Sequence, residues 1–435
     1  MKERPPLPPG PYLVVGLARS GAAAARMLRA HGEVIGCDAG EPEEAAGLEG
    51  IELELRSDGL GLLGRARTLV KSPGVPETAP VVAAARARGV EVTGELELAW
   101  RLIPNEFVAV TGTNGKTTTT ELLGAIHRAA AVSVAVAGNV GTPLSSYVGA
   151  LPAEAVVVCE CSSFQLEDSS AFAPECALLL NLQEDHLDRH GSFEAYAAAK
   201  RAIFARQRAG DVAVAPPPLA PAGTARAVTF GGEGADLRVR DGALVWRSQP
   251  LLDVAEVRLR GTHNLDNAMA AAAAALARGI EPEAVRRALR DFAGVPHRLE
   301  EVAERDGVLF VNDSKATNVA SARVGIEAFE GGVHAILGGS LKGGGFQGLR
   351  AAVETRCRAA YLIGEAAPRL EDDLDGTVEL HSCGDLERAV TAAAGASRPG
   401  DVVLLSPACA SYDQYRDFER RGEHFRALVE ALGEA

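Results

Sequence analysis

Cysteines are scarce in this sequence and follow no pattern that would join them. Seven cysteines are spread over 435 residues, and no two have the C-x-x-C spacing. An odd, unpaired set of this kind indicates neither a disulfide framework nor a zinc site. We expect Cys159 and Cys161 to be core residues of a single strand.

Long apolar runs and an excess of positive charge are also lacking. No run of 18 apolar residues occurs, and the proline-rich segment Met1–Gly10 lacks the basic and apolar regions of a signal peptide. The net charge of −14 argues against a nucleic-acid partner, since phosphate backbones are bound by Lys and Arg surfaces. We therefore expect a monomeric cytoplasmic protein with no membrane or nucleic-acid partner, in which local sites hold any anionic ligand.

The length and the composition favour several globular domains. A chain of 435 residues with 47% hydrophobic residues exceeds the size at which one core keeps growing. We predict an α/β protein with a Rossmann-like N-terminal domain over 1–104, a central P-loop-type mononucleotide-binding domain with a parallel sheet over 105–297, and a Rossmann-like C-terminal domain over 298–435.

Short apolar runs alternate with longer Ala/Leu/Arg stretches at helical spacing, which predicts βα units and parallel sheets. The expected strands are Tyr12–Val15, Glu33–Cys37, Thr68–Lys71, Phe107–Val110, Ala155–Glu160, Cys176–Asn181, Val308–Asn312, Ala335–Leu337, Ala360–Ile363 and Val402–Leu405. The expected helices include Ala22–Ala30, one from Thr117, one over Asn267–Leu276 and a C-terminal helix from about Tyr412. The segment Pro216–Gly234 is rich in Pro, Ala and Gly and is expected to be a surface excursion.

The segment Val108–Thr118 carries the strongest functional signal. It reads V-A-V-T-G-T-N-G-K-T-T, so a strand runs into a glycine-rich turn and then into a helix. Backbone N–H groups and a helix N-terminus converge in such a turn and bind phosphate. Lys116 would reach the β- and γ-phosphates, and Thr117 would bind Mg²⁺. Val110 replaces the first glycine of the general P-loop pattern, and the alternative is an ordinary Gly/Asn surface turn.

Candidate metal ligands follow this turn along the chain. Glu160 comes at the end of a strand, where ligands collect in open α/β sheets, although it would also suit a helix cap. His186 lies in a polar segment, where it is either a metal ligand or an inert side chain. Lys200, taken alone, reads as a solvated residue of an alanine-rich helix.

Near the N-terminus, Gly16-Leu-Ala-Arg-Ser-Gly21 is similar to a dinucleotide fingerprint whose middle glycine is alanine. Asp38 follows at the end of the next expected strand. Taken alone, this pattern favours an NAD-dependent oxidoreductase.

Several motifs together resemble the Mur ligase family, in order and spacing over nearly the whole chain. They are T-G-T-N-G-K-T, Gly138–Gly141, Glu160–Gln165, Glu184–His186, Lys200, Gly261–Asn264, His297-Arg298, Asn312–Asn318 and Leu405–Ser411. The last two resemble the branch of the family that adds D-glutamate. The resemblance implies that the carboxylate of UDP-N-acetylmuramoyl-L-alanine attacks the γ-phosphate of ATP. The resulting acyl phosphate is then attacked by the amine of D-glutamate.

The resemblance also implies roles for individual residues. The catalytic set is Lys116, Glu160, His186, Lys200, Arg298 and Lys315. ATP would be bound by Gly112, Thr113, Asn114, Gly115, Lys116, Thr117, Thr118, Asn264, Asn267, His297, Arg298 and Asp313. Two Mg²⁺ ions are implied, one on Thr117 and Glu160 and a second on His186 and Lys200. Because an ammonium group cannot ligate a cation, the resemblance implies that Lys200 is carbamylated.

The remaining implied residues bind the two other substrates. The sugar nucleotide would be held by Arg19, Ser20, Asp38, Ser72, Gly74, Asn139 and Ser163. The amino acid would be held by Lys315, Thr317, Lys342, Ser411 and Phe418, a set of cations and hydroxyls that suits a dicarboxylate. The alternatives are a sister ligase adding another amino acid, the NAD-dependent oxidoreductase, and a nucleotide-binding switch module.

Overall fold

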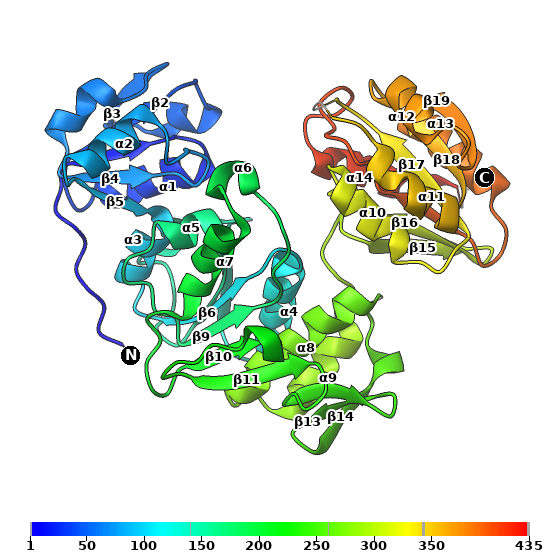
Figure 1. Ribbon diagram of the computed structural model, residues 1–435, viewed down its shortest axis with the longest axis horizontal. Helices are drawn as coiled ribbons and strands as arrows, with labels where there is room; N and C mark the ends of the chain where they lie inside the picture. Colours follow the sequence, from blue (N-terminus) through cyan, green and yellow to red (C-terminus); the bar gives the residue numbers. More distant parts are fainter. Residues whose placement is uncertain (1, 140, 260, 342–343, 433–435) are drawn as a thin grey trace. The chain divides into compact units, whose positions relative to one another are not determined.

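The computed structural model describes all residues except 1, 140, 260, 342–343 and 433–435 (Figure 1). Its contacts divide the chain into two compact units. The first comprises Met1–Arg258 with His263–Phe292, and the second comprises Leu259–Thr262 with Ala293–Ala435. The first unit contains an N-terminal and a central sheet, and the second contains a C-terminal sheet. The domain boundaries expected at residues 104 and 297 stay predictions.

The N-terminal sheet has five parallel strands in the order β3-β2-β1-β4-β5. They are β1 Tyr12–Val15, β2 Val34–Asp38, β3 Glu52–Leu55, β4 Thr68–Lys71 and β5 Glu91–Gly94. Successive residues of β1 enter different cores: Tyr12 and Val14 pack with helices α1 (Arg19–Leu28) and α3 (Glu95–Leu102), whereas Leu13 and Val15 pack with α2 (Pro80–Ala87). A sheet with both faces covered in this way is a doubly wound α/β layer, which confirms the expected Rossmann-like arrangement.

The central sheet has nine strands in the order β14-β13-β12-β11-β10-β9-β6-β8-β7. They are β6 Glu106–Thr111, β7 Val134–Gly138, β8 Val156–Glu160, β9 Cys176–Leu179, β10 Val212–Ala215, β11 Arg226–Gly231, β12 Leu237–Arg240, β13 Ala243–Trp246 and β14 Gln249–Asp253. All pairings from β7 to β12 are parallel, as expected, and the last two are antiparallel. Cys159 and Cys161 are buried as predicted, but only Cys159 belongs to β8, since the strand ends at Glu160. The structure describes all seven cysteines and joins none of them in a disulfide.

One expectation for the central sheet is wrong. Part of the segment predicted as a surface excursion is strand β11, which pairs parallel with β10. Within it Val228 and Phe230 are buried while Thr229 and Gly231 are only partly buried, the alternation of a strand with one covered face. The many Pro and Gly residues around it concealed this short pattern.

Helices complete the first unit. They are α4 Lys116–Ala129, α5 Ser163–Glu167, α6 Leu187–His190, α7 Phe193–Arg201, α8 Thr262–Ala277 and α9 Pro282–Asp291. Every residue of helix α8 from Ala268 to Ala275 is buried, and all of them except Met269 are alanines. The neighbours of α8 therefore pack closely against small side chains. Helix α1 begins at Arg19, three residues before the predicted Ala22. The sequence did not reveal this start because Ala18, which precedes the helix, has no side chain that could cap it.

The C-terminal sheet has the order β15-β16-β20-β17-β18-β19, with only β15 antiparallel to its neighbour. Its strands are β15 Glu300–Arg305, β16 Val308–Asn312, β17 Val333–Gly338, β18 Cys357–Ile363, β19 Glu379–Gly384 and β20 Val402–Leu405. Its helices are α10 Val319–Glu327, α11 Arg350–Arg356, α12 Ala367–Leu374, α13 Leu386–Ala396 and α14 Phe418–Ala431. Two cores cover its two faces, as expected for a Rossmann-like layer. The last helix begins at Phe418 rather than near Tyr412, because the Asp417 side chain caps it by accepting from Arg420 N.

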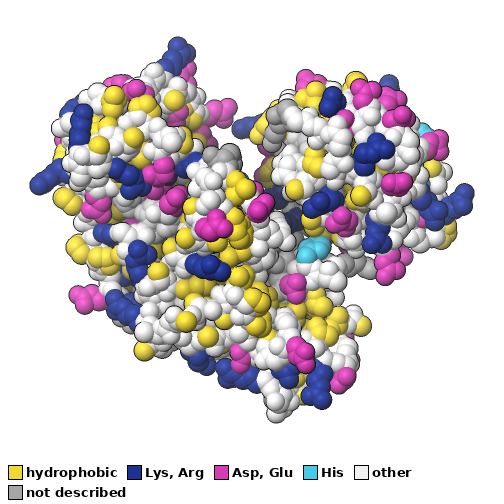
Figure 2. Space-filling view, in the orientation of Figure 1, with side chains coloured by type: hydrophobic (Ala, Val, Ile, Leu, Met, Phe, Trp, Pro, Cys, Tyr) yellow, Lys and Arg dark blue, Asp and Glu magenta, His cyan; other side chains and the backbone are white. Residues whose placement is uncertain are grey.

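Two surface features complete the description. Among the residues that the structure places, every helix is too short or too polar to cross a membrane. On the face seen in Figure 2, acidic and basic side chains are interspersed over both units, in keeping with the absence of a strongly basic composition.

Candidate active site

The predicted phosphate loop lies between β6, which ends at Thr111, and α4, which begins at Lys116. The backbone turns sharply at Gly115, where φ is 82°, and a Cβ atom there would lie 2.0 Å from Oδ1 of Asn267. Only glycine allows both this φ and the close approach of α8. The strand–turn–helix form predicted for this segment is confirmed, and phosphate binding by the turn stays a prediction.

Asn181, just after β9, holds this loop in shape. Its backbone oxygen accepts from Thr113 N at 3.1 Å, and its side chain accepts from Asn114 N at 2.9 Å and donates to Asn114 O at 3.2 Å. Sequence reasoning did not assign this asparagine to the site, although its place at the end of a central strand was a signal.

Two lysines meet at the loop. The Lys116 ammonium donates to Gly112 O at 3.1 Å and to Thr113 O at 3.0 Å, and the Lys200 ammonium donates to the same Gly112 oxygen at 2.7 Å. Lys200, in α7, is 2% exposed, so its interpretation as a solvated residue is wrong. Burial, reinforced by the charge of Lys116, lowers the pKa of Lys200 to about 7.

Glu160 ends β8 and is buried. Its Oε1 accepts from Asn139 Nδ2 at 3.1 Å, while its Oε2 is buried without a hydrogen-bond partner among the described residues. The alternative role of Glu160 as a helix cap is wrong, because Ser162 caps α5 together with Gln165. A buried carboxylate oxygen without a donor is costly unless a cation meets it.

His186 immediately precedes α6 in a left-handed backbone conformation, with φ of 52°. Its ring centroid lies 6.4 Å from that of Tyr196, whose ring also lies 4.7 Å from the Lys200 ammonium. The Tyr196 hydroxyl donates to Thr113 Oγ1 at 3.0 Å. Tyr196 therefore connects two predicted metal ligands with the phosphate loop, a role that the sequence did not indicate.

These residues fit magnesium better than a metal held by protein alone. Among the placed residues, no three His, Cys, Asp or Glu side chains gather into a metal-binding group. Mg²⁺ is usually bound by one or two carboxylates together with substrate phosphates and water. The free oxygen of Glu160 beside a phosphate loop matches that chemistry.

The predicted sugar-nucleotide residues of the N-terminal sheet surround the turn after β1. Ser72 Oγ donates to Gly16 O at 2.7 Å, and a Cβ atom at Gly21 would lie 1.8 Å from that oxygen. The Asp38 carboxylate accepts backbone N–H groups from Leu17 at 2.7 Å and from Gly40 at 2.8 Å, so it shapes the turn. Arg19 and Gly74 are exposed, and Ser20 is half-buried.

Asn139 and Ser163, the two residues predicted to lie near the reacting group, differ in their exposure to solvent. Asn139 is exposed, and its backbone N–H donates to Glu160 O at 2.9 Å. Ser163 is 2% exposed, and its hydroxyl lies 3.0 Å from Nε2 of His190. Sequence reasoning gave no role to His190.

In the first unit, Asn264 and Asn267 are both buried on α8, and Asn267 Nδ2 donates to Asn264 Oδ1 at 3.2 Å. The approach of Asn267 to Gly115 brings this part of the predicted nucleotide set to the phosphate loop.

In the second unit, Asp313 directly follows β16. Its carboxylate accepts from Ser406 Oγ at 2.7 Å and from Leu299 N at 3.2 Å, and burial raises the pKa of Asp313 to about 7. His297 is buried, and its Nδ1 lies 3.0 Å from Asn312 Nδ2. The positive charge of Arg298 is close enough to lower the pKa of Asp313, which opposes the effect of burial. The three predicted nucleotide residues of this unit, His297, Arg298 and Asp313, therefore lie near one another.

The predicted amino-acid set is partly gathered in the same unit. The Lys315 ammonium lies 5.9 Å from the ring centre of Phe418. Ser411 is buried, and its hydroxyl has no partner among the described residues. Thr317 donates its backbone N–H to Lys315 O at 2.9 Å, and Lys342 lies outside the described residues.

Arg421, on α14, organises this region and was missed by sequence reasoning. It is 1% exposed, and its guanidinium donates to Ser314 Oγ, Ser314 O and Cys409 O at 2.9–3.0 Å. A buried arginine with several carbonyl acceptors fixes the segments that supply them. It therefore ties the segment carrying Asp313 and Lys315 to the one carrying Ser411.

Comparison with known proteins identifies the family. The sequence matches the Mur ligase middle domain over residues 110–275 and the Mur ligase glutamate ligase domain over residues 297–409. The UDP-N-acetylmuramoylalanine--D-glutamate ligase of Acidobacterium capsulatum is 44% identical over 439 residues, covering 96% of this chain and 95% of the relative. The enzyme of that name from Anaeromyxobacter dehalogenans is 45% identical over 451 residues, covering 96% of each.

A solved structure shares the fold. The UDP-N-acetylmuramate-alanine ligase of Thermotoga maritima has a TM-score of 0.61 at 19% identity, covering 97% of this chain and 99% of that one. With the expected phosphate loop in place and close relatives aligned from end to end, the chain belongs to the Mur ligase family of ATP-dependent ligases.

Proposed function

We propose that this ligase adds D-glutamate to UDP-N-acetylmuramoyl-L-alanine through an acyl phosphate, with ATP and two Mg²⁺ ions. The observation that carries the proposal is the convergence of Lys116 and Lys200 on the Gly112 carbonyl, beside a buried Glu160 with one free oxygen. The names of the relatives support the choice of D-glutamate. The similarity of this chain to these ligases over nearly its whole length argues against an oxidoreductase and against a nucleotide-binding switch module.

The first unit would supply the phosphate chemistry. Lys116 and the N-terminus of α4 would bind the ATP phosphates, since both are positive and both meet at the loop. Thr117 and Glu160 would hold one Mg²⁺ ion, which neutralises phosphate charge when bound. Asn139 would keep the Glu160 carboxylate oriented through its bond to Oε1.

Lys200 would act as a carbamate. Its neutral amine adds to CO₂, which forms a N–C bond and releases one proton to solvent. The carbamate nitrogen keeps one N–H, which could still donate to Gly112 O. With His186, it would then offer an anionic ligand set for the second Mg²⁺ ion.

The second unit carries the remaining residues proposed for the nucleotide and those proposed for the amino acid. Asp313 would accept from the ribose hydroxyls, and Arg298 would place positive charge near the γ-phosphate. The proposed amino-acid residues are Lys315, Thr317, Lys342, Ser411 and Phe418. Two lysines and two hydroxyls suit the two carboxylates of glutamate. The monomeric state and the cytoplasmic location stay predictions.

Phosphate release tests this proposal. The purified enzyme is given ATP, Mg²⁺, UDP-N-acetylmuramoyl-L-alanine and each of a panel of D- and L-amino acids. Release is expected only with D-glutamate and is expected to be lost in Lys116→Ala. Turnover with another amino acid instead would favour a sister ligase, and full activity of Lys116→Ala would contradict the assignment of the phosphate loop.

A further inference from the structure

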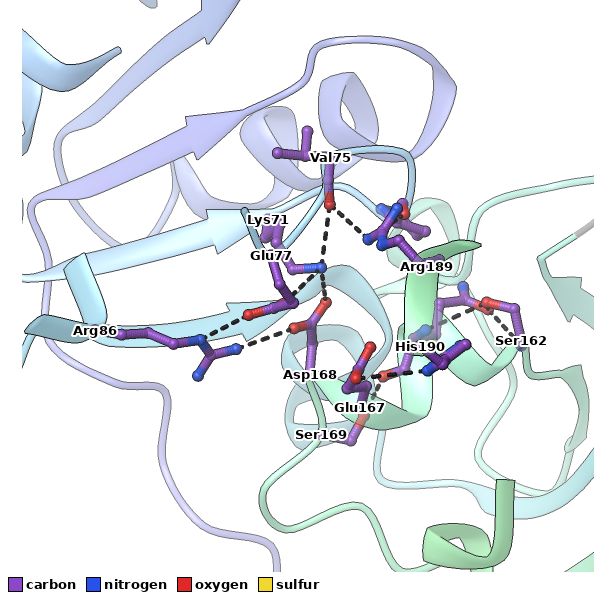
Figure 3. A network of polar contacts seen from close by, with 12 residues as sticks. Lys71, Val75, Glu77, Arg86, Ser162, Glu167, Asp168, Ser169, Arg189 and His190 are labelled. Atoms are coloured by element: carbon purple, nitrogen blue, oxygen red, sulfur yellow. Dashed lines mark hydrogen bonds and ion pairs between the residues drawn. The ribbon is translucent and has the colours of Figure 1, made fainter. Parts of the chain in front are cut away.

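A loop at the edge of the N-terminal sheet is held from two sides. This rim loop, residues 72–77, connects β4 to α2 and carries the proposed sugar-nucleotide residues Ser72 and Gly74. The Val75 oxygen accepts from Lys71 Nζ at 3.3 Å and from Arg189 at 2.6 Å, and Arg189 also donates to Pro73 O at 3.2 Å (Figure 3). Lys71 belongs to the N-terminal sheet, whereas Arg189 belongs to α6 of the central part of the unit.

Lys71 is fully buried in an ion cluster. Its ammonium lies 2.9 Å from Asp168 and 3.1 Å from Glu77, and Arg86 lies 2.7 Å from Glu77 and 3.7 Å from Asp168. Two cations thus alternate with two carboxylates (Figure 3). Lys71 and Asp168 are buried, whereas Glu77 and Arg86 are 30% and 48% exposed. Because a buried charge that loses its partner is very costly, the cluster ties β4 to Asp168 at the end of α5.

Helix α6 depends on side chains for its position. It has only four residues, and a single turn is barely stable by its own backbone bonds. Arg189 ties it to the rim loop and lies 4.5 Å over the ring of Phe164 on α5. His190 stacks on the same ring at 5.3 Å and contacts Ser163. His186, the proposed metal ligand, immediately precedes this helix.

The geometry points to Arg189 and Lys71 as positioning residues. Arg189 joins the rim loop to α6, which His186 immediately precedes, and Lys71 joins the loop to Asp168 just after α5. These two residues fix the position of the loop that binds the sugar nucleotide relative to His186, which binds the Mg²⁺ ion. This inference rests on the proposed function.

Two consequences follow. Binding of the sugar nucleotide steadies the rim loop and, through Arg189, also His186, so it strengthens Mg²⁺ binding. By thermodynamic reciprocity, Mg²⁺ strengthens sugar-nucleotide binding by the same factor. Replacing a residue that orients a metal ligand without itself contacting the metal typically weakens metal binding about 10- to 100-fold.

Steady-state kinetics measure this coupling at saturating ATP and D-glutamate. For each variant, the Mg²⁺ concentration giving half-maximal rate is determined at low and at saturating UDP-N-acetylmuramoyl-L-alanine. In Arg189→Ala, that concentration and the KM for the sugar nucleotide are both expected to rise about tenfold, while the KM for ATP changes less than twofold. The half-maximal Mg²⁺ concentration is then expected to stop depending on the sugar nucleotide. Arg189→Lys is expected to restore part of both values, since its ammonium can still donate to a loop carbonyl.

Arg29→Ala is the matched control. It also removes an arginine bond to a backbone oxygen of the N-terminal part, to Glu49 O at 2.7 Å, but has no contact with α5 or α6 among the residues described. Its kinetic constants are expected to equal those of the wild type. If Arg189→Ala melts below the assay temperature, Arg189→Gln replaces it and is expected to shift both constants about threefold in the same direction.

The outcomes separate the two proposals. Unchanged constants in a folded Arg189 variant, or a change in the sugar-nucleotide KM without a change in Mg²⁺ dependence, would overturn this inference alone. A wild-type enzyme that consumes no ATP with the sugar nucleotide and any amino acid would overturn the proposed function and this inference with it.

Discussion

The state of Lys200 gives the sharpest prediction about this enzyme. An ordinary lysine has a pKa of about 10.4, so roughly one amine in 2,500 is neutral at pH 7. With its pKa lowered to about 7, about half of the Lys200 amines are neutral at that pH. Only the neutral amine reacts with CO₂, so the burial beside Lys116 raises the reactive fraction about a thousandfold.

The pH dependence follows from the same shift. As the pH falls through about 7, the Lys200 amine takes up a proton and its carbamate releases CO₂. In ¹³C-bicarbonate, the carbamate signal in the ¹³C NMR spectrum is therefore expected to be strong at pH 8 and to disappear by about pH 6. Lys116→Ala is expected to weaken the signal at pH 7 without abolishing it, since burial is the larger cause of the lowered pKa, and Lys200→Met is expected to lose the signal. A signal that persists in Lys200→Met would refute the assignment.

Activity provides the second half of this test. Lys200→Ala is expected to lower kcat at least about a hundredfold, since an anionic ligand is removed. Acetate or propionate is expected to restore part of the rate, because the truncated side chain leaves room for a small carboxylate. Full activity of Lys200→Ala, or no rescue at any carboxylate concentration, would contradict a carbamate.

Three further predictions concern the frame of the site. Gly115→Ala is expected to lower the free energy of unfolding by about 1–3 kcal/mol and to raise the KM for ATP, because the added Cβ would collide with Asn267 and alanine disfavours a φ of 82°. Denaturant unfolding measures the first effect and steady-state kinetics the second, and an unchanged KM would contradict the prediction. For Asp313, whose folded pKa is about 7, stability is expected to fall by up to about 1.4 kcal/mol per unit as pH rises from 4 to 7, since the folded acid holds a proton that the unfolded chain has released. Calorimetry at several pH values should show that Asp313→Asn flattens this slope, and an equal slope would exclude it. Lys71→Met should lose about 3–5 kcal/mol in urea unfolding, and adding Asp168→Leu should restore much of it; additive losses would refute the pairing.

The sequence predicted the architecture well because its signals are local. A strand such as β1 is continuously apolar in a sheet covered on both faces, and four residues are enough to show it. The phosphate loop was predictable for the same reason, since its glycines, lysine and threonine are adjacent in the chain. The strand β11 was missed because four alternating residues inside a Pro- and Gly-rich segment are a weak local signal.

Contacts between segments that are distant in the chain could not be predicted from the sequence. Lys71 and Asp168 are far apart in the chain, and each alone reads as a surface charge near a strand or helix end. Arg189 was visible only as one charge in a polar segment that also holds His186. Residues of this kind become informative only when the fold shows that they are buried and what faces them.

For the carbamate proposed on Lys200, one neighbouring charge would both prepare the amine and stabilise the product. The positive charge of Lys116, second to burial, disfavours the protonated Lys200 and so prepares the amine for CO₂. Once the carbamate has formed, the side chain changes from cation to anion, and the same Lys116 charge becomes attractive. Because both ammonium groups contact the Gly112 oxygen in the unmodified state, this reversal takes place within a few ångströms of the phosphate loop. The proposed modification would therefore remove a repulsion between two cations and would place an anion beside the phosphate loop, where the second Mg²⁺ ion is proposed to bind.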